Sequence, residues 1–235
     1  MAGTAEPRNA ATVTLAGETL HPASDATLHW PDMDTLFIAD PHFGKAATFR
    51  SHGIPVPEQA SFDLLRLQRA LDETGARTLV ILGDLFHARA GVTAEVQDAL
   101  QRWRDEHRSL TITLIRGNHD RSAGDPTSTL GMDIHDGPMQ MGPFALCHEP
   151  RHCNSGYALA GHLHPAVMLE DARTRARFRC FHFGADIGVL PAFGSFTGAK
   201  VVQPALGDRV FVLVEGQIAQ VSGSTPALQA EDAGS

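Results

Sequence analysis

The sequence is poor in cysteine, in long apolar runs and in positive charge. Its 235 residues include only three cysteines, Cys147, Cys153 and Cys180. So sparse and odd a set argues against a disulfide framework and is typical of a reducing compartment. No apolar run approaches the roughly 18 residues of a membrane-spanning helix, and residues 1–20 lack the basic flank and apolar core of a signal peptide. We therefore expect a cytoplasmic protein without a membrane segment.

The shortage of positive charge narrows the classes of partner. Nineteen Lys and Arg stand against 27 Asp and Glu, which gives a formal net charge of −8. A surface that coats nucleic acid without regard to sequence needs clustered Lys and Arg, so such a surface is not expected. A site that cleaves phosphoesters is still compatible with this charge, because bound metal ions can supply local positive charge.

The pattern along the first half of the chain alternates strand and helix. Short apolar segments predict buried strands at 35–40, 77–84 and 110–118. Segments with an apolar stripe at helical spacing predict helices at 58–76 and 94–107. This alternation is typical of parallel strands with helices outside them, and ligands of such sheets bind beyond the carboxyl ends of the strands.

The second half has a different pattern. After about residue 133, short strands are separated by Gly and Pro turns, which favours a mostly antiparallel β-structure. We therefore predict one α/β domain over residues 11–221, in which two mixed sheets pack face to face with helices on the outer faces. Flexible tails are expected at 1–10 and 222–235.

Polar clusters follow the predicted strands in a fixed order: Asp40-x-His42, Gly83-Asp84-x-x-His87, Gly117-Asn118-His119-Asp120, His148 and Gly161-His162-x-His164. Each cluster alone is compatible with an ordinary turn or a surface histidine, but all of them in this order rarely arise from turns. Carboxylate, imidazole and amide groups together suit divalent Mn, Fe, Zn or Ni. So many candidate ligands exceed the needs of one tetrahedral ion and fit two ions that share a bridging carboxylate.

These motifs resemble those of the calcineurin-like metallophosphoesterase superfamily: D-x-H, G-D-x-x-[DH], G-N-H-[DE], H and G-H-x-H. The resemblance spans residues 40–164 and implies a four-layer αββα sandwich of two mixed β-sheets flanked by helices. It implies that one ion is held by Asp40, His42, Asp84 and His164. It implies that the second ion is held by Asp84, Asn118, His148 and His162, with Asp84 bridging.

The resemblance also implies catalytic roles beyond the metal ligands. His119 would contact the substrate phosphate and protonate the leaving group, and Asp120 would orient His119, since carboxylates often hydrogen-bond imidazoles near metals. His148 is the loosest assignment, because His152 and His135 are nearby competitors for the same position. The segment "CHEPRHC" (147–153) has a second interpretation as a small zinc site, although its spacing matches no common zinc motif.

Further segments resemble the ligase-associated DNA damage response endonucleases of bacteria. They are "ADPHFGKAATFRSHGIPVP" (39–57), "GDLFHAR" (83–89), "HEP" (148–150) and "LPAFGSFTGAKVV" (190–202). "GDLFH" is also shared with nuclease subunits of bacterial recombination complexes, which singles out His87 as a residue on the substrate side. Lys45, Arg50 and Arg89 lie near the metal motifs in the sequence and are candidate contacts for a nucleic-acid backbone.

Two stretches keep open interpretations. Arg173, Arg175, Arg177 and Arg179 make a basic strand that either faces DNA or keeps an exposed sheet edge soluble. Phe193 and Phe196 either stack on a base or pack in the core beside the site.

The sequence thus predicts a two-metal phosphodiesterase that acts on DNA in bacterial repair, most simply a single-stranded DNA endonuclease with manganese favoured and Fe, Zn or Ni as alternatives. An enzyme for small nucleotides or other small phosphoesters is the main alternative. A protein-binding scaffold is less favoured, because every ligand motif is intact. The resemblance implies an ATP-dependent DNA ligase and a helicase-like protein as partners.

Overall fold

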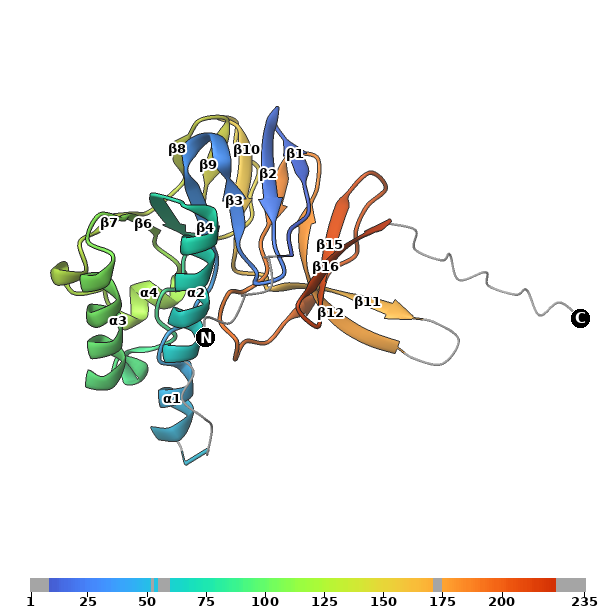
Figure 1. Ribbon diagram of the computed structural model, residues 1–235. Coiled ribbons are helices and arrows are strands. Elements are labelled where there is room, and N and C mark those ends of the chain that lie inside the picture. The colour runs from blue at the N-terminus through green and yellow to red at the C-terminus, as the bar shows by residue number, and fades with distance from the viewer. Residues whose placement is uncertain (1–8, 52, 55–59, 171–174, 223–235) are drawn as a thin grey trace, which may run out of the picture.

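The computed structural model describes residues 9–51, 53–54, 60–170 and 175–222. Two β-sheets lie face to face, with helices gathered on one side of the molecule (Figure 1). The first sheet follows the chain from β1 to β7. Its strands are β1 (Val13–Leu15), β2 (Glu18–Pro22), β3 (Leu28–Trp30), β4 (Thr35–Ile38), β5 (Thr78–Ile81), β6 (Thr111–Ile115) and β7 (Met132–His135).

The first sheet is mixed. The strands from β1 to β4 pair antiparallel, whereas β4, β5, β6 and β7 pair parallel, each with the next. The parallel part is the predicted strand–helix alternation, and its connections contain the helices. These are α1 (Lys45–Ser51), α2 (Ala60–Thr74), α3 (Ala94–Glu106) and α4 (Asn118–Ala123), with 3-10 turns η1 (Pro31–Met33), η2 (Arg89–Gly91) and η3 (Ser128–Leu130).

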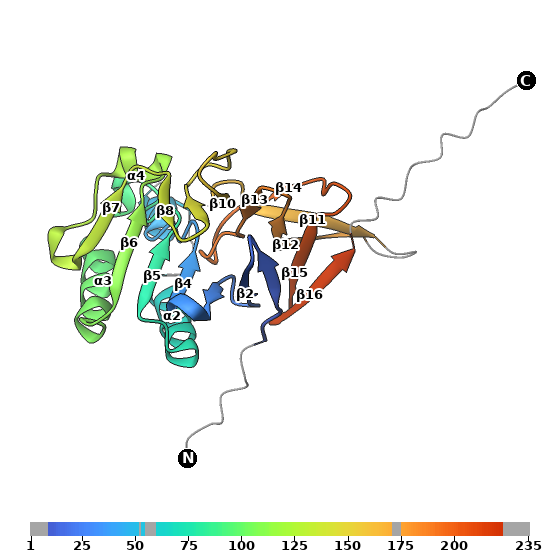
Figure 2. The same cartoon turned by 90° about the horizontal axis from the view of Figure 1, so that it is seen from above.

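Both faces of the sheet are buried at β4, and at β5 and β6 beyond their first residues, which explains why these three strands are mostly apolar. Leu36 and Ile38 of β4 belong to the core that contains the α2 stripe. Phe37, between them, belongs to the core that joins the two sheets. Side chains alternate between the two faces of a strand, so a strand covered on both sides needs apolar residues at every position. Figure 2 shows β4, β5 and β6 between α2 and α3 on one side and the second sheet on the other.

The stripe of α2 packs as its spacing predicts. Leu64, Leu67 and Leu71 are all buried against the first sheet. The helix ends where glycine allows a left-handed residue: Gly75 has a φ of 66°, and its amide donates to the carbonyl of Leu71 at 2.8 Å. The first two residues of the predicted helix, 58 and 59, lie outside the described residues.

The second sheet is also mixed. Its strands are β8 (Met139–Met141), β9 (Phe144–Leu146), β10 (Tyr157–Ala160), β11 (Pro165–Glu170), β12 (Arg175–Phe183), β13 (Ile187–Val189), β14 (Lys200–Val201), β15 (Arg209–Val214) and β16 (Gln217–Ser222). Their order is β14-β11-β12-β13-β10-β9-β8, and β15 pairs with both β12 and β16. β10 is parallel to β9 and to β13, whereas most of the other pairs are antiparallel.

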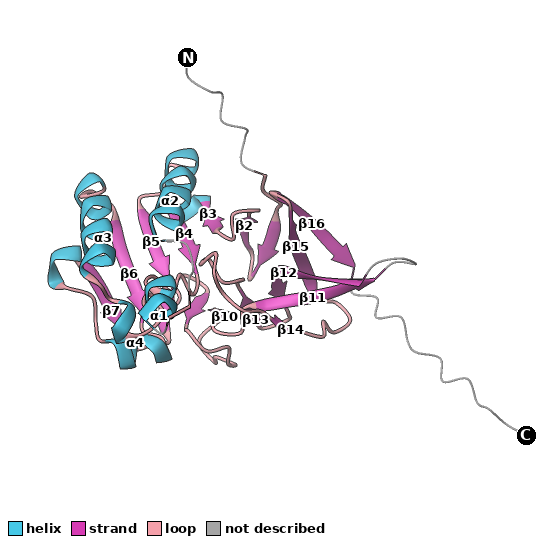
Figure 3. Ribbon diagram, turned by 90° about the horizontal axis from the view of Figure 1, so that it is seen from below, coloured by secondary structure: helices cyan, strands magenta, loops and turns pink. Residues whose placement is uncertain are grey.

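The prediction of two packed, mixed sheets with flanking helices is confirmed, and the structure adds where the helices lie. In Figure 3 they cover the first sheet, and the described part of the chain after Ala123 contains no α-helix. The outer face of the second sheet therefore has no helical layer among the described residues. No described helix is long and apolar enough to cross a membrane.

The predicted tails fall almost wholly on residues 1–8 and 223–235, outside the described part of the chain. Asn9 and Ala10 differ from the prediction, because both are bound to the folded domain. The Asn9 side chain accepts a hydrogen bond from the Ile218 amide at 2.8 Å, and Ala10 forms a bridge with Ala23. Of the basic strand, Arg173 lies outside the described residues, and the other three arginines lie on β12.

Candidate metal centre

Three predicted ligands follow neighbouring parallel strands of the first sheet. Asp40 follows β4, Asp84 follows β5, and Asn118 begins α4 after β6. Backbone hydrogen bonds tie the first two loops together, since the Asp40 amide donates to Gly83 at 3.1 Å and the His42 amide donates to Asp84 at 2.9 Å. The carboxyl ends of the strands thus deliver these side chains to one place, as predicted for this kind of sheet.

The remaining ligands come from the second sheet. His148 follows β9, whereas His162 and His164 follow β10, its parallel neighbour. The Gly161 amide donates to the His148 carbonyl at 3.0 Å, and the His162 amide donates to the Asp40 carboxylate at 2.8 Å. The second contact joins the two sheets, so the site lies across their shared edge.

The side chains form two clusters whose nitrogen and oxygen atoms lie within 4.8 Å of one another. One cluster holds Asp40, His42 and His164, and the other holds Asp84, His148 and His162. Asp84 lies between them: its two carboxylate oxygens are 3.8 Å from Nε2 of His42 and 3.4 Å from Nε2 of His148. The arrangement follows the two predicted ligand sets, with Asp84 placed to bridge.

Asn118 lies at the second cluster. Its Oδ1 is 3.0 Å from Nε2 of His148, and the same nitrogen is 3.1 Å from Nδ1 of His162. An amide oxygen and two imidazole nitrogens therefore converge on one point. This convergence is the donor set expected for the second ion.

Backbone carbonyls fix which imidazole nitrogen faces the clusters. Nδ1 of His148 donates to the Leu82 carbonyl at 2.9 Å, and Nδ1 of His164 donates to the Gly198 carbonyl at 3.1 Å. A carbonyl oxygen only accepts, so these contacts keep the proton on Nδ1 and leave the lone pair on Nε2 for a metal.

A buried carboxylate oxygen tests whether the residues suit a cation. Oδ1 of Asp40 is fully buried and accepts no hydrogen bond from the described residues. Its nearest cationic candidates are Nε2 of His164 at 3.6 Å and Nδ1 of His148 at 3.7 Å. A buried carboxylate oxygen without partners is costly, and a divalent ion held by Asp40 would satisfy it. The residues present therefore fit two divalent ions.

The electrostatics of the site agree with this interpretation. Burial, together with His164 and Lys45, lowers the pKa of His42 to about 2, so this imidazole stays neutral and able to bind metal. Burial and the nearby Asp40 carboxylate raise the pKa of Asp84. Two neighbouring carboxyl groups disfavour each other's ionised form, and a bound cation stabilises the ionised form of both.

The backbone around the ligands is strained. Nine described residues other than glycine have positive φ, and five of them are predicted ligands: Asp40, His42, Asp84, His162 and His164. Such conformations are uncommon for residues with a Cβ and concentrate at functional sites. The glycines beside them leave room: a Cβ on Gly83 would overlap the His148 ring, and one on Gly117 would overlap the Asp84 carboxylate.

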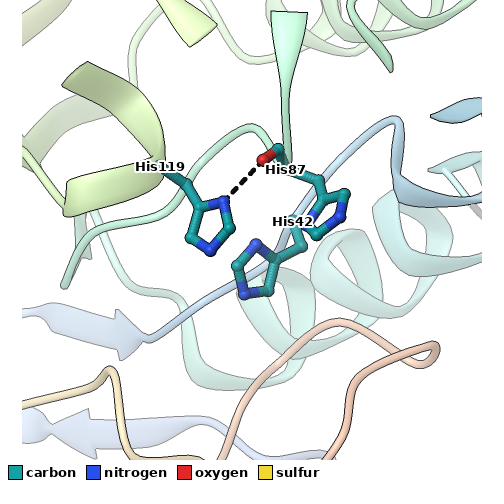
Figure 4. A group of neighbouring side chains, drawn as sticks. All are labelled: His42, His87 and His119. Carbon is teal, nitrogen blue, oxygen red and sulfur yellow. Dashed lines mark hydrogen bonds between the residues drawn. The ribbon is translucent and has the colours of Figure 1, made fainter. Parts of the chain in front are cut away.

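His119 lies next to the clusters and is held firmly. Its amide donates to Asp84 at 2.9 Å, and Nδ1 of its ring donates to the His87 carbonyl at 2.6 Å (Figure 4). The rings of His42 and His87 lie 5.0 and 5.1 Å from the ring of His119. The other ring nitrogen of His119, Nε2, is therefore the one available to a substrate.

The predicted role of Asp120 is wrong. Its carboxylate accepts from the Gly117 amide at 2.9 Å and from the Phe86 amide at 3.3 Å, so it fixes the start of α4. The His87 carbonyl, which sequence reasoning did not consider, orients the His119 ring instead. A backbone acceptor leaves no signal in the sequence, because every residue has one.

His87 lies beside the metal clusters. Its ring stacks on that of His119 and meets the edge of His42 at 5.4 Å between centroids. Burial, with repulsion from Lys45 and His119, lowers the pKa of His87 to about 4. This imidazole is therefore neutral at physiological pH.

The three predicted substrate contacts are not equivalent. Lys45, at the start of α1, acts electrostatically on His42 and His87 and is itself half-buried, which lowers its pKa. Lys45 and Arg50 line one pocket with His42. Arg89 is exposed on η2, and no hydrogen bond or ion pair within the described residues joins it to the metal clusters.

Sequence reasoning singled out Phe193 and Phe196 of the loop at 191–198 but not the contacts of this loop with the first ligand motif. The Phe193 amide donates to Ala39 at 2.6 Å and the Gly194 amide donates to Asp40 at 3.2 Å, so this loop supports the first ligand motif. Asp63 of α2 accepts hydrogen bonds from the Ser195 amide and hydroxyl. The signal was present, since Asp63 interrupts the buried apolar stripe of α2.

The alternative zinc site in "CHEPRHC" is not formed. Cys147 is buried, with its thiol 3.8 Å from the Leu159 carbonyl, while His148 points into the metal clusters. His152 lies 3.8 Å from Asp186 on the exposed surface. No metal-binding group among the described residues includes either cysteine of this segment.

Two packed mixed sheets with paired carboxylate–imidazole clusters at their shared edge define a metal-dependent phosphoester hydrolase. Residues 33–187 match the family model of the calcineurin-like phosphoesterases. The chain belongs to this family.

Solved structures extend the comparison. The chain is similar to the Pseudomonas putida nuclease MPE, with 38% identity, a TM-score of 0.80, and coverage of 91% of this chain and 100% of that one. It also matches YfcE, a phosphoesterase from E. coli, at 17% identity and a TM-score of 0.37, over 81% of this chain and 99% of that one. A search of curated proteins found no match.

Proposed function

We propose that this protein is an endonuclease that hydrolyses phosphodiester bonds of single-stranded DNA with two divalent ions, manganese being favoured. The observation that carries the proposal is the pairing of two metal-binding clusters with 38% identity to a nuclease over nearly the whole chain. The cations Lys45 and Arg50 in the adjoining pocket support a substrate with several phosphates.

The residues of the chain divide the chemistry among them. Two divalent ions, when bound, activate water and offset the negative charge that develops on phosphorus. Asp40, His42, Asp84, Asn118, His148, His162 and His164 would hold them. His119 would act as the acid in its imidazolium form, in which Nδ1 donates to the His87 carbonyl and Nε2 gives its proton to the leaving oxygen. His87 and Lys45 border the position of the substrate phosphate.

The test is a manganese titration with an end-labelled single-stranded oligonucleotide. Wild type is compared with Asp84→Asn, and a chromogenic phosphodiester serves as a second substrate. Internal cuts that need both manganese and Asp84 support the endonuclease. Hydrolysis of the chromogenic diester beside an intact oligonucleotide contradicts it and favours the alternative below.

The alternative is an enzyme for small nucleotides or other small phosphoesters. The net charge of −8 favours it, because an acidic protein gains little long-range attraction for a polyanion. The same clusters and the same His119 serve either substrate, so substrate length is the quantity that separates the two proposals.

A repair role belongs to the same proposal. It places the protein in the cytoplasm of a bacterium and makes an ATP-dependent DNA ligase and a helicase-like protein its partners. What supports it is the sequence resemblance to the ligase-associated endonucleases. Genes for such proteins next to this one are the expected observation, and their absence would weaken the pathway without touching the chemistry.

A further inference from the structure

An exposed phenylalanine borders the metal centre. Phe196 is 40% exposed, although most large aromatic side chains of the chain are buried, Phe193 of the same loop at 0% among them. Phe196 lines the same pocket as His42, Lys45 and Arg50. The two phenylalanines of this loop therefore have different environments: Phe193 packs in the core, and Phe196 faces the pocket beside the site.

Aromatic rings connect Phe196 to the reacting centre. Phe196 meets the edge of Phe49 at 5.3 Å between centroids, and Phe49 lies nearly parallel to His87 at 6.5 Å. His87 in turn stacks on His119 at 5.1 Å. A series of ring contacts thus links Phe196, at the pocket, to the imidazole assigned to the leaving group.

Phe196 is held in place by its neighbours in the chain. The Gly194 amide donates to Asp40, the Ser195 amide donates to Asp63 at 3.2 Å, and the Gly198 carbonyl accepts from His164. The loop is anchored on both sides of Phe196 to metal-binding residues or to α2. The exposed ring is therefore part of a fixed surface, and its position relative to the metal clusters is set.

The chemistry of this surface fits an unpaired nucleotide. Cations bind the phosphates of a strand and aromatic faces stack on its bases, which is how single-stranded nucleic acid is held without reading its sequence. Lys45 and Arg50 supply the cations of the pocket, and Phe196 supplies the ring. A base inside a duplex has both faces covered by its neighbours, so it offers no face to such a ring.

We propose that Phe196, supported by Phe49, stacks on a base next to the scissile phosphate and thereby selects single-stranded over duplex DNA. This inference rests on the proposed function and adds to it the residue that determines specificity. The ring acts on substrate binding and takes no part in the metal chemistry.

The experiment uses an end-labelled oligothymidylate in which one nucleotide is replaced by an abasic tetrahydrofuran analogue. Bonds far from the analogue are the internal standard for cleavage within each lane. Wild type should cut one bond near the analogue about tenfold more slowly than the distant bonds, as expected when one stacked base is lost. Phe196→Ala should cut distant bonds about tenfold more slowly than wild type and show no further loss at the analogue.

Three further variants separate stacking from apolar contact. Phe196→Trp keeps a ring and should restore both the rate and the sensitivity to the analogue, whereas Phe196→Leu keeps an apolar side chain and should not. Phe62→Ala is the matched control, because Phe62 is 57% exposed on α2 and does not line the pocket. It should behave as wild type. Manganese stoichiometry measured on each variant shows whether the metal centre is intact.

The outcomes separate this inference from the function on which it rests. If Phe196→Ala keeps the wild-type sensitivity to the analogue, or if wild type has none, the stacking role is overturned while the endonuclease stands. If wild type hydrolyses the chromogenic diester and cuts no oligonucleotide, the proposed function fails and the stacking role fails with it.

Discussion

Nδ1 of His119 donates a 2.6 Å hydrogen bond to the backbone carbonyl of His87. The bond joins the motif that contains His87 to the motif that contains His119. Its acceptor belongs to the backbone, so no side-chain substitution at residue 87 removes it. It also fixes the tautomer of His119 whenever that ring is neutral, with the proton on Nδ1. The reactive nitrogen is thereby determined by the fold, ahead of any substrate.

This relationship predicts a dependence on the leaving group. Replacing His119 with Asn removes the acid, so hydrolysis of DNA, whose leaving alcohol is a poor one, should fall about a hundredfold or more. A nitrophenyl diester, whose leaving group is far more acidic, should lose much less. Initial rates on both substrates check this. Equal losses would assign His119 to binding the phosphate alone.

Asp84 is predicted to be the residue that both ions share. Asp84→Asn keeps an oxygen that accepts from the His119 amide, so the fold should be retained, but the bridging charge is lost. Bound manganese should fall from two ions per chain to one or fewer, and activity should fall at least about a hundredfold. Metal analysis of the purified protein beside Asp98→Asn, an exposed acid on α3, is the measurement. Two retained ions would contradict the bridging role.

Gly83 is predicted to be required for two reasons: its positive φ, and the close approach of the His148 ring, which leaves no room for a Cβ. Gly83 and Gly17 have almost the same φ, 87° and 88°, but a Cβ on Gly83 would overlap His148 whereas one on Gly17 meets nothing. Both alanine variants should lose about 1–2 kcal/mol through backbone strain. Only Gly83→Ala should lose more than this, together with metal. Urea unfolding and manganese binding of the pair measure the difference, and equal behaviour would contradict it.

Buried neutral histidines predict that the metal-free protein loses stability in mild acid. Burial lowers the pKa of His87 to about 4, while its unfolded value is about 6.5. The unfolded chain therefore binds more protons between these values, so the free energy of unfolding falls as pH falls from about 6.5 to 4. Urea unfolding in EDTA across this range measures the slope.

A substitution isolates the contribution of His87 to that slope. His87→Asn should flatten the slope by less than the limit of about 1.4 kcal/mol per pH unit for one proton, because water screens a ring that is only partly buried. His135→Asn, which changes an exposed histidine at the end of β7, is the control variant. An unchanged slope in His87→Asn would show that this ring is not held neutral by the fold.

Much of the site was predictable because its ligands follow strands that the apolar pattern reveals. Asp40 and Asp84 end segments that are buried on both faces, and parallel pairing then brings them together. The strands β1 and β3 were missed, since three residues are too few to show a period. The same reason applies to β8 and β13.

The supporting contacts were less predictable than the ligands. The carbonyls of His87 and Gly198 orient two imidazoles, yet any residue type supplies a carbonyl. Asp120 was assigned to His119 because the two residues are adjacent in the sequence. In the first turn of α4, its carboxylate instead accepts hydrogen bonds from backbone amides. Side chains on successive helical residues point in different directions.

The hydrogen bond from His164 to the Gly198 carbonyl has a consequence for how the centre is assembled during synthesis. All seven ligands have left the ribosome once residue 164 has, but the group that orients the last of them is encoded 34 residues later. The ligands of the first sheet also form only part of each metal-binding cluster until the second sheet packs against the first. We therefore expect the chain to hold both ions only after the two sheets have joined.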